Sequence, residues 1–203
     1  EQYRIVDEKT VYKRYIRILS RTTEHPVTQV RTDWDIVGSA YPLFCVVFPF
    51  FTATQSTRLV REYMQGPNTF AYTLAAGAFE AHKHTSPLVA AQREMSEEAR
   101  LRGGRYVNLA QLDDAAELAE AAHWTDPAVL AKLPLELKWG TNRFVPYLCI
   151  DPEDDPTPYD RDAEEADMTV VQVTIAELRQ LILRGQVLLP SVQTIWCGLE
   201  WLR

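Results

Sequence analysis

Three glutamates lie close together in the hexapeptide Arg-Glu-Met-Ser-Glu-Glu at residues 93–98. At about 100° of rotation per residue, a helix would place Glu94, Glu97 and Glu98 in one arc, beside an arc of apolar residues that can pack. Like charges at this spacing destabilise a helix by roughly 0.2–0.5 kcal/mol per pair, so the cluster favours a compensating cation. Carboxylate oxygens suit Mg²⁺ or Mn²⁺, with coordination positions left for water and phosphate.

The same spacing is also compatible with an ordinary solvated helix face. Arg93 could form an ion pair with Glu97, and Glu98 could form one with Arg102. The sequence on either side of the hexapeptide is therefore needed to distinguish a metal site from a charged surface.

The elements that would position the glutamates are a strand, a loop and a helix. Residues 69–75 predict a strand that ends near Gly77. Ser86 and Pro87 predict a helix start, because serine caps a helix and proline fits its first turn. We expect this helix to run to about Leu101, before the glycines at 103–104.

The remaining pattern predicts a β-rich first half and a mixed second half. Extended segments are expected at 11–19 and 27–37, and a hairpin at 43–51 and 58–63. Later elements are short helices in 111–135, a strand at 143–150, an acidic loop at 151–167, a strand at 168–173, and helices at 175–184 and 191–202.

The composition is that of a globular chain: of 203 residues, 46% are hydrophobic and 24% are charged, with a net charge of -7. This charge disfavours strong binding to nucleic acid by the chain alone. The longest apolar run, 40–51, is too short to cross a bilayer, so no membrane partner is expected. Three isolated cysteines predict an intracellular, reducing compartment, cytoplasm or organelle matrix; a targeting peptide would precede this sequence.

The hexapeptide, preceded by a glycine-ended strand, resembles the signature of the Nudix hydrolase superfamily. The resemblance implies an α+β fold, an α/β/α sandwich with a mixed sheet between helices and an N-terminal antiparallel extension. We expect domains at 1–40, where dimerisation could occur, and 41–203. It also implies that Glu94, Glu97, Glu98 and Ala76 hold Mg²⁺ or Mn²⁺, and that Arg93 orients the glutamates.

The chain looks closest to the ADP-ribose and ADP-sugar pyrophosphatase branch. The resemblance assigns a general base to Glu164, with Glu165 as the alternative, and catalytic roles to Glu98 and Arg93. Candidate substrate contacts are Trp34, Gly77, His82, His84, Trp139 and Arg143. Core packing of the tryptophans and solvation of the histidines are the competing interpretations.

Several positions depart from the family pattern. The loop between Gly77 and Arg93 is two residues longer than the family spacing, and Arg100 replaces the usual glycine after the glutamates. Met64 stands where the branch has a phosphate-binding arginine, and Thr73 where it has a glutamate. These departures affect the positions expected to select the substrate, whereas the three glutamates of the hexapeptide are retained.

Three functions remain open. The first is hydrolysis of a nucleoside diphosphate-linked small molecule. The second is hydrolysis at the 5′ triphosphate or cap end of RNA within a larger RNA-processing complex, and the third is a nucleotide-binding scaffold without turnover. A homodimer is expected by analogy with the branch.

Overall fold

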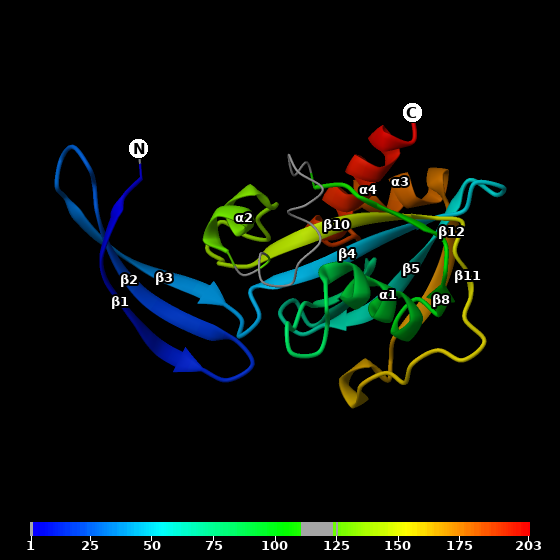
Figure 1. Cartoon of the computed structure of the whole chain (residues 1–203), viewed down its shortest axis with the longest axis horizontal. Coiled ribbons are helices and arrows are strands. Elements are labelled where there is room, and N and C mark those ends of the chain that lie inside the picture. Colours follow the sequence, from blue (N-terminus) through cyan, green and yellow to red (C-terminus); the bar gives the residue numbers. More distant parts are fainter. Residues whose placement is uncertain (1, 111–123, 125) are drawn as a thin grey trace. The chain divides into compact units, whose positions relative to one another are not determined.

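The computed structural model describes residues 2–110, 124 and 126–203. It divides into two compact units (Figure 1). The first comprises Glu1–Pro42 and Leu135–Arg143, and the second comprises Leu43–Pro134 and Phe144–Arg203.

The first unit is built on an antiparallel sheet in the order β1 (Arg4–Lys13), β2 (Arg17–Glu24) and β3 (Arg31–Gly38). The single segment predicted at 11–19 is wrong, because residues 14–16 reverse the chain between β1 and β2. This turn contains no glycine, proline or asparagine. Without such a residue, the sequence pattern does not distinguish one long strand from two strands joined by a turn. The segment predicted at 27–37 starts later, at Arg31, because Gln29 has a positive φ of 56° in the preceding turn.

The second unit contains three sheets and four α-helices among its described residues. Its strands are β4 (Leu43–Phe50), β5 (Ser56–Met64), β6 (Thr69–Thr73), β7 (Ala75–Ala78), β8 (Leu101–Arg102), β9 (Arg105–Asn108), β10 (Arg143–Ile150), β11 (Glu153–Asp154) and β12 (Thr169–Thr174). Its helices are α1 (Pro87–Glu97), α2 (Pro127–Lys132), α3 (Ile175–Leu183) and α4 (Leu189–Trp201), with a 3₁₀ turn at Ala163–Glu165.

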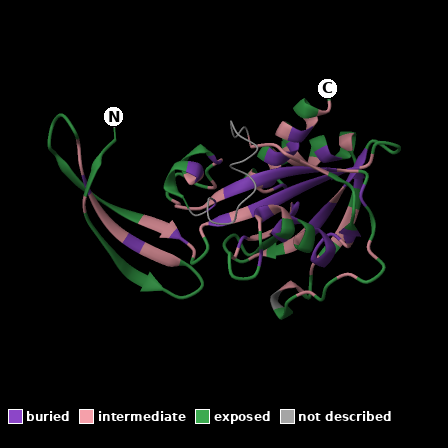
Figure 2. Cartoon of the chain, viewed as in Figure 1, coloured by how far each residue is buried: buried purple, intermediate pink, exposed green. Residues whose placement is uncertain are grey.

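The core lies on both faces of the sheet with strand order β7-β4-β10-β9. Alternate residues of β4 point to opposite faces, so Cys45 and Val47 pack with α1, whereas Val46 and Phe48 pack with α4. Figure 1 shows α1 and α4 on opposite sides of β4 and β10, and Figure 2 shows both strands buried along most of their length. The predicted α/β/α sandwich is confirmed.

Two predicted strand arrangements need correction. The turn after β4 closes at the bridge between Phe51 and Ser56, but β4 and β5 then enter different sheets rather than forming a hairpin. The strand predicted at 69–75 is divided at Leu74, with β6 pairing with β5 and β7 pairing with β4. A run of β-prone residues cannot show such a change of partner, since only tertiary contacts distinguish the two halves.

The helix predictions hold with shifted ends. Ser86 caps α1 as expected. The helix α2 falls within residues 111–135, which were predicted to contain short helices. Residues 111–123 and 125 of that segment are not among the residues that the structure describes. The helix α1 ends at Glu97 rather than near Leu101, and α4 begins at Leu189. In the part of the chain described, no helix has the length and apolar character needed to cross a membrane.

The contact between α4 and β4 depends on the absence of a side chain at Gly198. A methyl group there would lie 2.6 Å from Cδ1 of Phe48, which is completely buried. We expect Gly198→Ala to lower the free energy of unfolding by about 1–2 kcal/mol, because overpacking outweighs the gain in helix propensity. Chemical denaturation checks this, with the exposed Gln193→Ala on the same helix as the control. Equal stability of the two variants would contradict the close approach.

Candidate active site

The helix α1 begins at a serine cap and packs one face against the sheet. The Ser86 hydroxyl accepts a hydrogen bond from the backbone N–H of Val89 at 3.3 Å. Ala90, Ala91 and Met95 are completely buried, so this face is fixed to the core. The adjoining arc, which carries the glutamates, is thereby directed to the end of β7.

Glu98 occupies the C-cap position of α1 and is buried, with 5% of its surface exposed. Its Oε2 accepts a hydrogen bond from the backbone N–H of Ala76 at 2.8 Å. Glu98 and Ala76 are therefore brought together, as the sequence predicted, although the observed contact uses the N–H of Ala76 rather than its carbonyl.

Glu94 lies against Gly77. A methyl group on Gly77 would lie 2.0 Å from Oε1 of Glu94, so a larger residue there would force this carboxylate to shift. Glu97 is also buried, and its Oε2 lies 3.5 Å from Nε of Arg93. The Arg93 guanidinium lies 4.9 Å from the ring centre of Tyr159, so it contacts both an anion and an aromatic face.

An acidic cavity of about 330 Å³ opens beside Glu98 and Ala76. No lysine, arginine or histidine is among its described lining residues, which are Glu62, Tyr63, Gln65, Leu74, Ala76, Glu98, Asp162, Glu165, Asp167 and Met168. Five of these side chains are carboxylic acids, so a positively charged ligand is favoured there.

The sequence analysis missed Glu62, which comes from β5. A glutamate was sought where Thr73 stands, but Thr73 is buried and its hydroxyl shares a hydrogen bond with Ser191 at 3.0 Å. The sequence feature that could have pointed to Glu62 is its position on a strand, two residues after the buried pair Leu59 and Val60. That signal alone does not say which cavity the residue lines.

Burial and mutual repulsion raise the pKa values of four of these carboxyl groups. Burial is the largest cause for Glu94, whose pKa rises to about 7, and repulsion from Glu97 adds to it. The pKa of Glu98 is raised well above its usual range by burial and then by Glu94. Burial likewise raises the pKa of Glu62 and of Glu165, and the charge of Glu165 adds to the shift at Glu62.

Two arginines hold the acidic loop at the C-terminal end of α1. Arg161 donates from Nη2 to the carbonyl of Glu98 at 2.7 Å and from Nη1 to the carbonyl of Met168. Arg58 donates from Nη1 to the carbonyl of Ala99 at 3.3 Å and to Asp154 at 2.8 Å. These bonds satisfy helix-end carbonyls and place positive charge at the negative end of the helix dipole.

The loop held by Arg161 carries both candidates for the general base. Glu165 lines the acidic cavity, and its Oε2 accepts a hydrogen bond from the backbone N–H of Asp162 at 3.2 Å. The side chain of Glu164 lies outside the described residues. The structure thus brings Glu165 to the same cavity as Glu98.

The histidines of the predicted phosphate-binding loop do not line the acidic cavity. His84 is buried, with its Nδ1 accepting from the backbone N–H of Glu80 at 3.3 Å, and His82 lies 3.7 Å from the same glutamate. Lys83 and His84 instead line a separate cavity of about 380 Å³, shared with Arg93 and Tyr159. The competing interpretation, that the histidines are simply solvated, does not hold for His84, and its role in substrate binding stays a prediction.

The remaining predicted substrate contacts belong to the first unit, whereas the glutamates belong to the second. Trp34 is 38% exposed and donates from Nε1 to the hydroxyl of Thr23 at 2.9 Å, and Trp139 is 52% exposed. Neither tryptophan is a buried core residue. Arg143 is the first residue of β10. Roles for these three residues in substrate binding stay predictions.

The carboxylates match the preference of Mg²⁺ and Mn²⁺ for oxygen ligands. Within the described residues, however, no group of three or more His, Cys, Asp or Glu side chains is arranged so that it could hold a metal ion. The site therefore fits a divalent cation by charge and donor type. Coordination by several glutamates would require their side chains to adjust.

Comparison with solved structures finds the same fold in a protein described as an ADP compounds hydrolase. The match covers 100% of this chain and 95% of the other, with a TM-score of 0.66 and 17% sequence identity. No family model and no curated protein matches the sequence. The structural match confirms the predicted α+β fold.

The raised carboxyl pKa values predict how the metal-free protein responds to pH. Since the pKa of Glu94 is about 7 in the folded chain against 4.5 ordinarily, the folded state binds this proton more tightly. Its contribution to stability is full below about pH 4.5 and is lost as pH rises through about 7. We expect the melting temperature in EDTA to fall over this range, and Glu94→Gln to flatten the fall. A melting temperature that rises between these values would contradict the shift.

The helix-end contacts predict a structural role for Arg161. Arg161→Ala leaves the carbonyls of Glu98 and Met168 without this donor, so we expect a loss of about 2 kcal/mol in the free energy of unfolding. The loop at 155–168 should also become more sensitive to limited proteolysis. Arg203→Ala is the control, because it removes an exposed ion pair with Glu200. A loss no larger than that of the control would refute the role of Arg161.

Proposed function

We propose that this chain is a Mg²⁺-dependent hydrolase of the Nudix type that cleaves a pyrophosphate bond in a nucleoside diphosphate-linked substrate, such as an ADP-ribose-like or ADP-sugar-like molecule. The observation that carries the proposal is the position of Glu98 and Glu94 beside the Ala76-Gly77 segment of β7, with Glu97 on the same helix end. Mn²⁺ is the alternative metal, since it has the same ligand preferences.

In this proposal Glu94, Glu97 and Glu98 hold the cation, which when bound stabilises negative charge on the phosphate oxygens. Arg93 keeps Glu97 oriented through their ion pair. Glu165 accepts the proton of the attacking water, and its raised pKa brings its proton affinity closer to the range that a base needs near neutral pH. The backbone N–H of Asp162 holds the Glu165 carboxylate in place.

A substrate panel tests the reaction. Phosphate or nucleotide release would be measured with ADP-ribose, ADP-glucose, dinucleoside polyphosphates, nucleoside triphosphates and triphosphorylated RNA, each with and without Mg²⁺. We expect Mg²⁺-dependent release of a nucleoside monophosphate from a diphosphate-linked compound. Turnover of triphosphorylated RNA alone would show that the substrate is the 5′ end of RNA and not a diphosphate-linked small molecule. Inactivity on the whole panel would favour a binding or scaffold role.

Replacement of one ligand tests the chemistry. Glu98→Gln preserves shape and the acceptor for Ala76 but removes a charge, so we expect kcat to fall by at least about 100-fold. The variant should remain folded, and Mn²⁺ should no longer raise its melting temperature. Glu153→Gln, an exposed carboxylate paired with Arg102, is the matched control and should keep full activity. Unchanged turnover in Glu98→Gln would reject the metal assignment.

A further inference from the structure

Two positively charged residues face each other at one end of the β1-β2 hairpin. In the antiparallel register of these strands, Lys13 lies directly opposite Arg17. The turn between them contributes a third cation, Arg14. Like charges directly opposite each other destabilise a strand pair. Repulsion between Lys13 and Arg17 therefore destabilises this end of the sheet.

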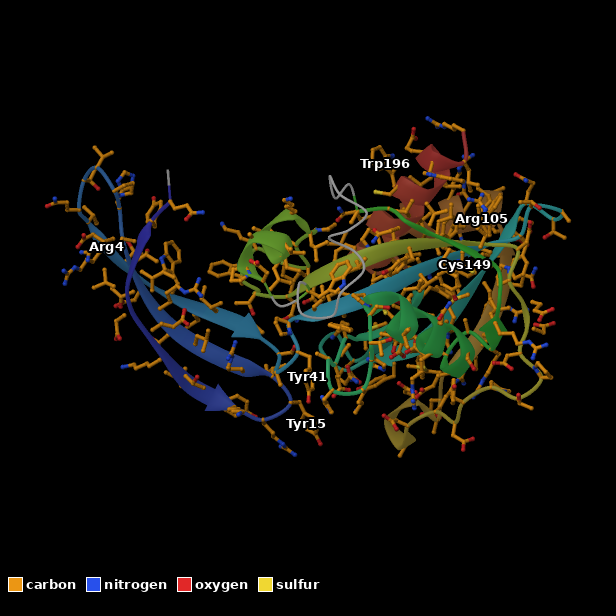
Figure 3. The ribbon with its side chains drawn as sticks, in the orientation of Figure 1. Arg4, Tyr15, Tyr41, Arg105, Cys149 and Trp196 are labelled. Atoms are coloured by element: carbon orange, nitrogen blue, oxygen red, sulfur yellow. The ribbon has the colours of Figure 1, made fainter. Side chains whose placement is uncertain are left out.

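The rest of the sheet is arranged in the opposite way. Arg4 lies opposite Glu24, and their side chains form an ion pair at 2.6 Å. Arg21 lies opposite Glu8 and is paired with it, and Arg31 lies 3.0 Å from Glu24. Within the described residues, no carboxylate forms an ion pair with Lys13, Arg14 or Arg17. Figure 3 shows Arg4 toward one end of this sheet and Tyr15 and Tyr41 toward the other.

The unpaired cations surround a cavity of about 250 Å³ within the first unit. Its described lining contains no carboxylate and consists of Thr10, Lys13, Arg14, Tyr15, Ile16, Arg17 and Ala40. The Nε atom of Arg17 is buried and has no hydrogen-bond partner among the residues that the structure describes. A buried donor without an acceptor is costly, so a ligand that supplies acceptor oxygens would be favoured here.

We propose that this cavity, which we call the hairpin cavity, binds a phosphate group of a small anion. Guanidinium groups match the geometry of phosphate oxygens, and a phosphate would supply an acceptor for Arg17. The chain as a whole carries a charge of -7, which repels long polyanions. A local cluster of three cations therefore favours a compact phosphate ligand over a nucleic-acid strand.

The ring of Tyr15 suggests how a nucleotide and a free phosphate can be told apart. Tyr15 is 74% exposed, and the guanidinium of Arg14 lies 5.1 Å from its ring centre. An exposed aromatic face next to a cation can stack on a nucleobase. If the natural ligand is a nucleotide, ADP should bind more tightly than pyrophosphate, whereas equal binding indicates recognition of the phosphates alone.

The experiment uses the full chain in EDTA, so that the glutamate site cannot hold a metal-phosphate complex. Pyrophosphate and ADP are titrated by calorimetry, and the amide NMR signals of residues 13–17 are followed. We expect one binding event that weakens with salt and shifts those signals. Lys13→Gln/Arg14→Gln, which changes two exposed side chains, should weaken it at least tenfold.

The control variant Lys9→Gln/Arg31→Gln removes the same charges from exposed positions of the same sheet. It should change the affinity less than twofold. An equal loss in both variants would show that only net charge matters and would overturn the proposal. It would also be overturned by no binding, by signal shifts confined to other residues, or by binding of single-stranded RNA without binding of pyrophosphate. None of these outcomes depends on hydrolysis.

Discussion

The second unit is organised around a concentration of negative charge at the end of one helix. The last turn of α1 carries Glu94, Glu97 and Glu98, and the helix dipole is itself negative at this end. Glu98 is almost fully buried, and its carboxylate accepts a hydrogen bond from the backbone N–H of Ala76. Such an arrangement costs stability unless the charge is neutralised, either by protons, as the raised pKa values indicate, or by a bound cation.

The surrounding structure responds to this charge in two different ways. On the backbone side, Arg58 and Arg161 donate to the carbonyls that α1 leaves unsatisfied, and both bring the acidic loop with them. On the side-chain side, the cavity next to Glu98 gathers further carboxylates such as Glu62 and Glu165 instead of cations. The chain thus places arginines at the carbonyls of the helix end, whereas the described lining of the cavity contains carboxylates and no lysine, arginine or histidine.

Local sequence signals predicted the elements that carry the site, and long-range contacts decided what those signals could not. Patterns over a few residues predicted the Ser86 cap and the apolar face of α1, and the structure contains both. Gly77 lies near the end of the strand before this helix, as predicted, and contacts Glu94. Glu62 was missed because it reaches the site through strand pairing, which periodicity does not reveal. The register between Glu164 and Glu165 stayed open for a related reason, since a loop held by Arg161 has no repeating pattern to align.

Arg100 shows how a departure from the Nudix signature that the sequence resembles is accommodated by the backbone. The position that is usually glycine has a φ of 58° here, a left-handed conformation that costs a non-glycine residue about 1 kcal/mol or more. The Arg100 side chain donates to the carbonyl of Tyr159 at 2.7 Å, which offsets part of this cost and ties the acidic loop to the turn. The chain therefore ends α1 just after the glutamates with an arginine in a conformation that favours glycine. A substitution at this position bears on stability, whereas in the proposed function a substitution at Glu94 or Glu98 would bear on the chemistry.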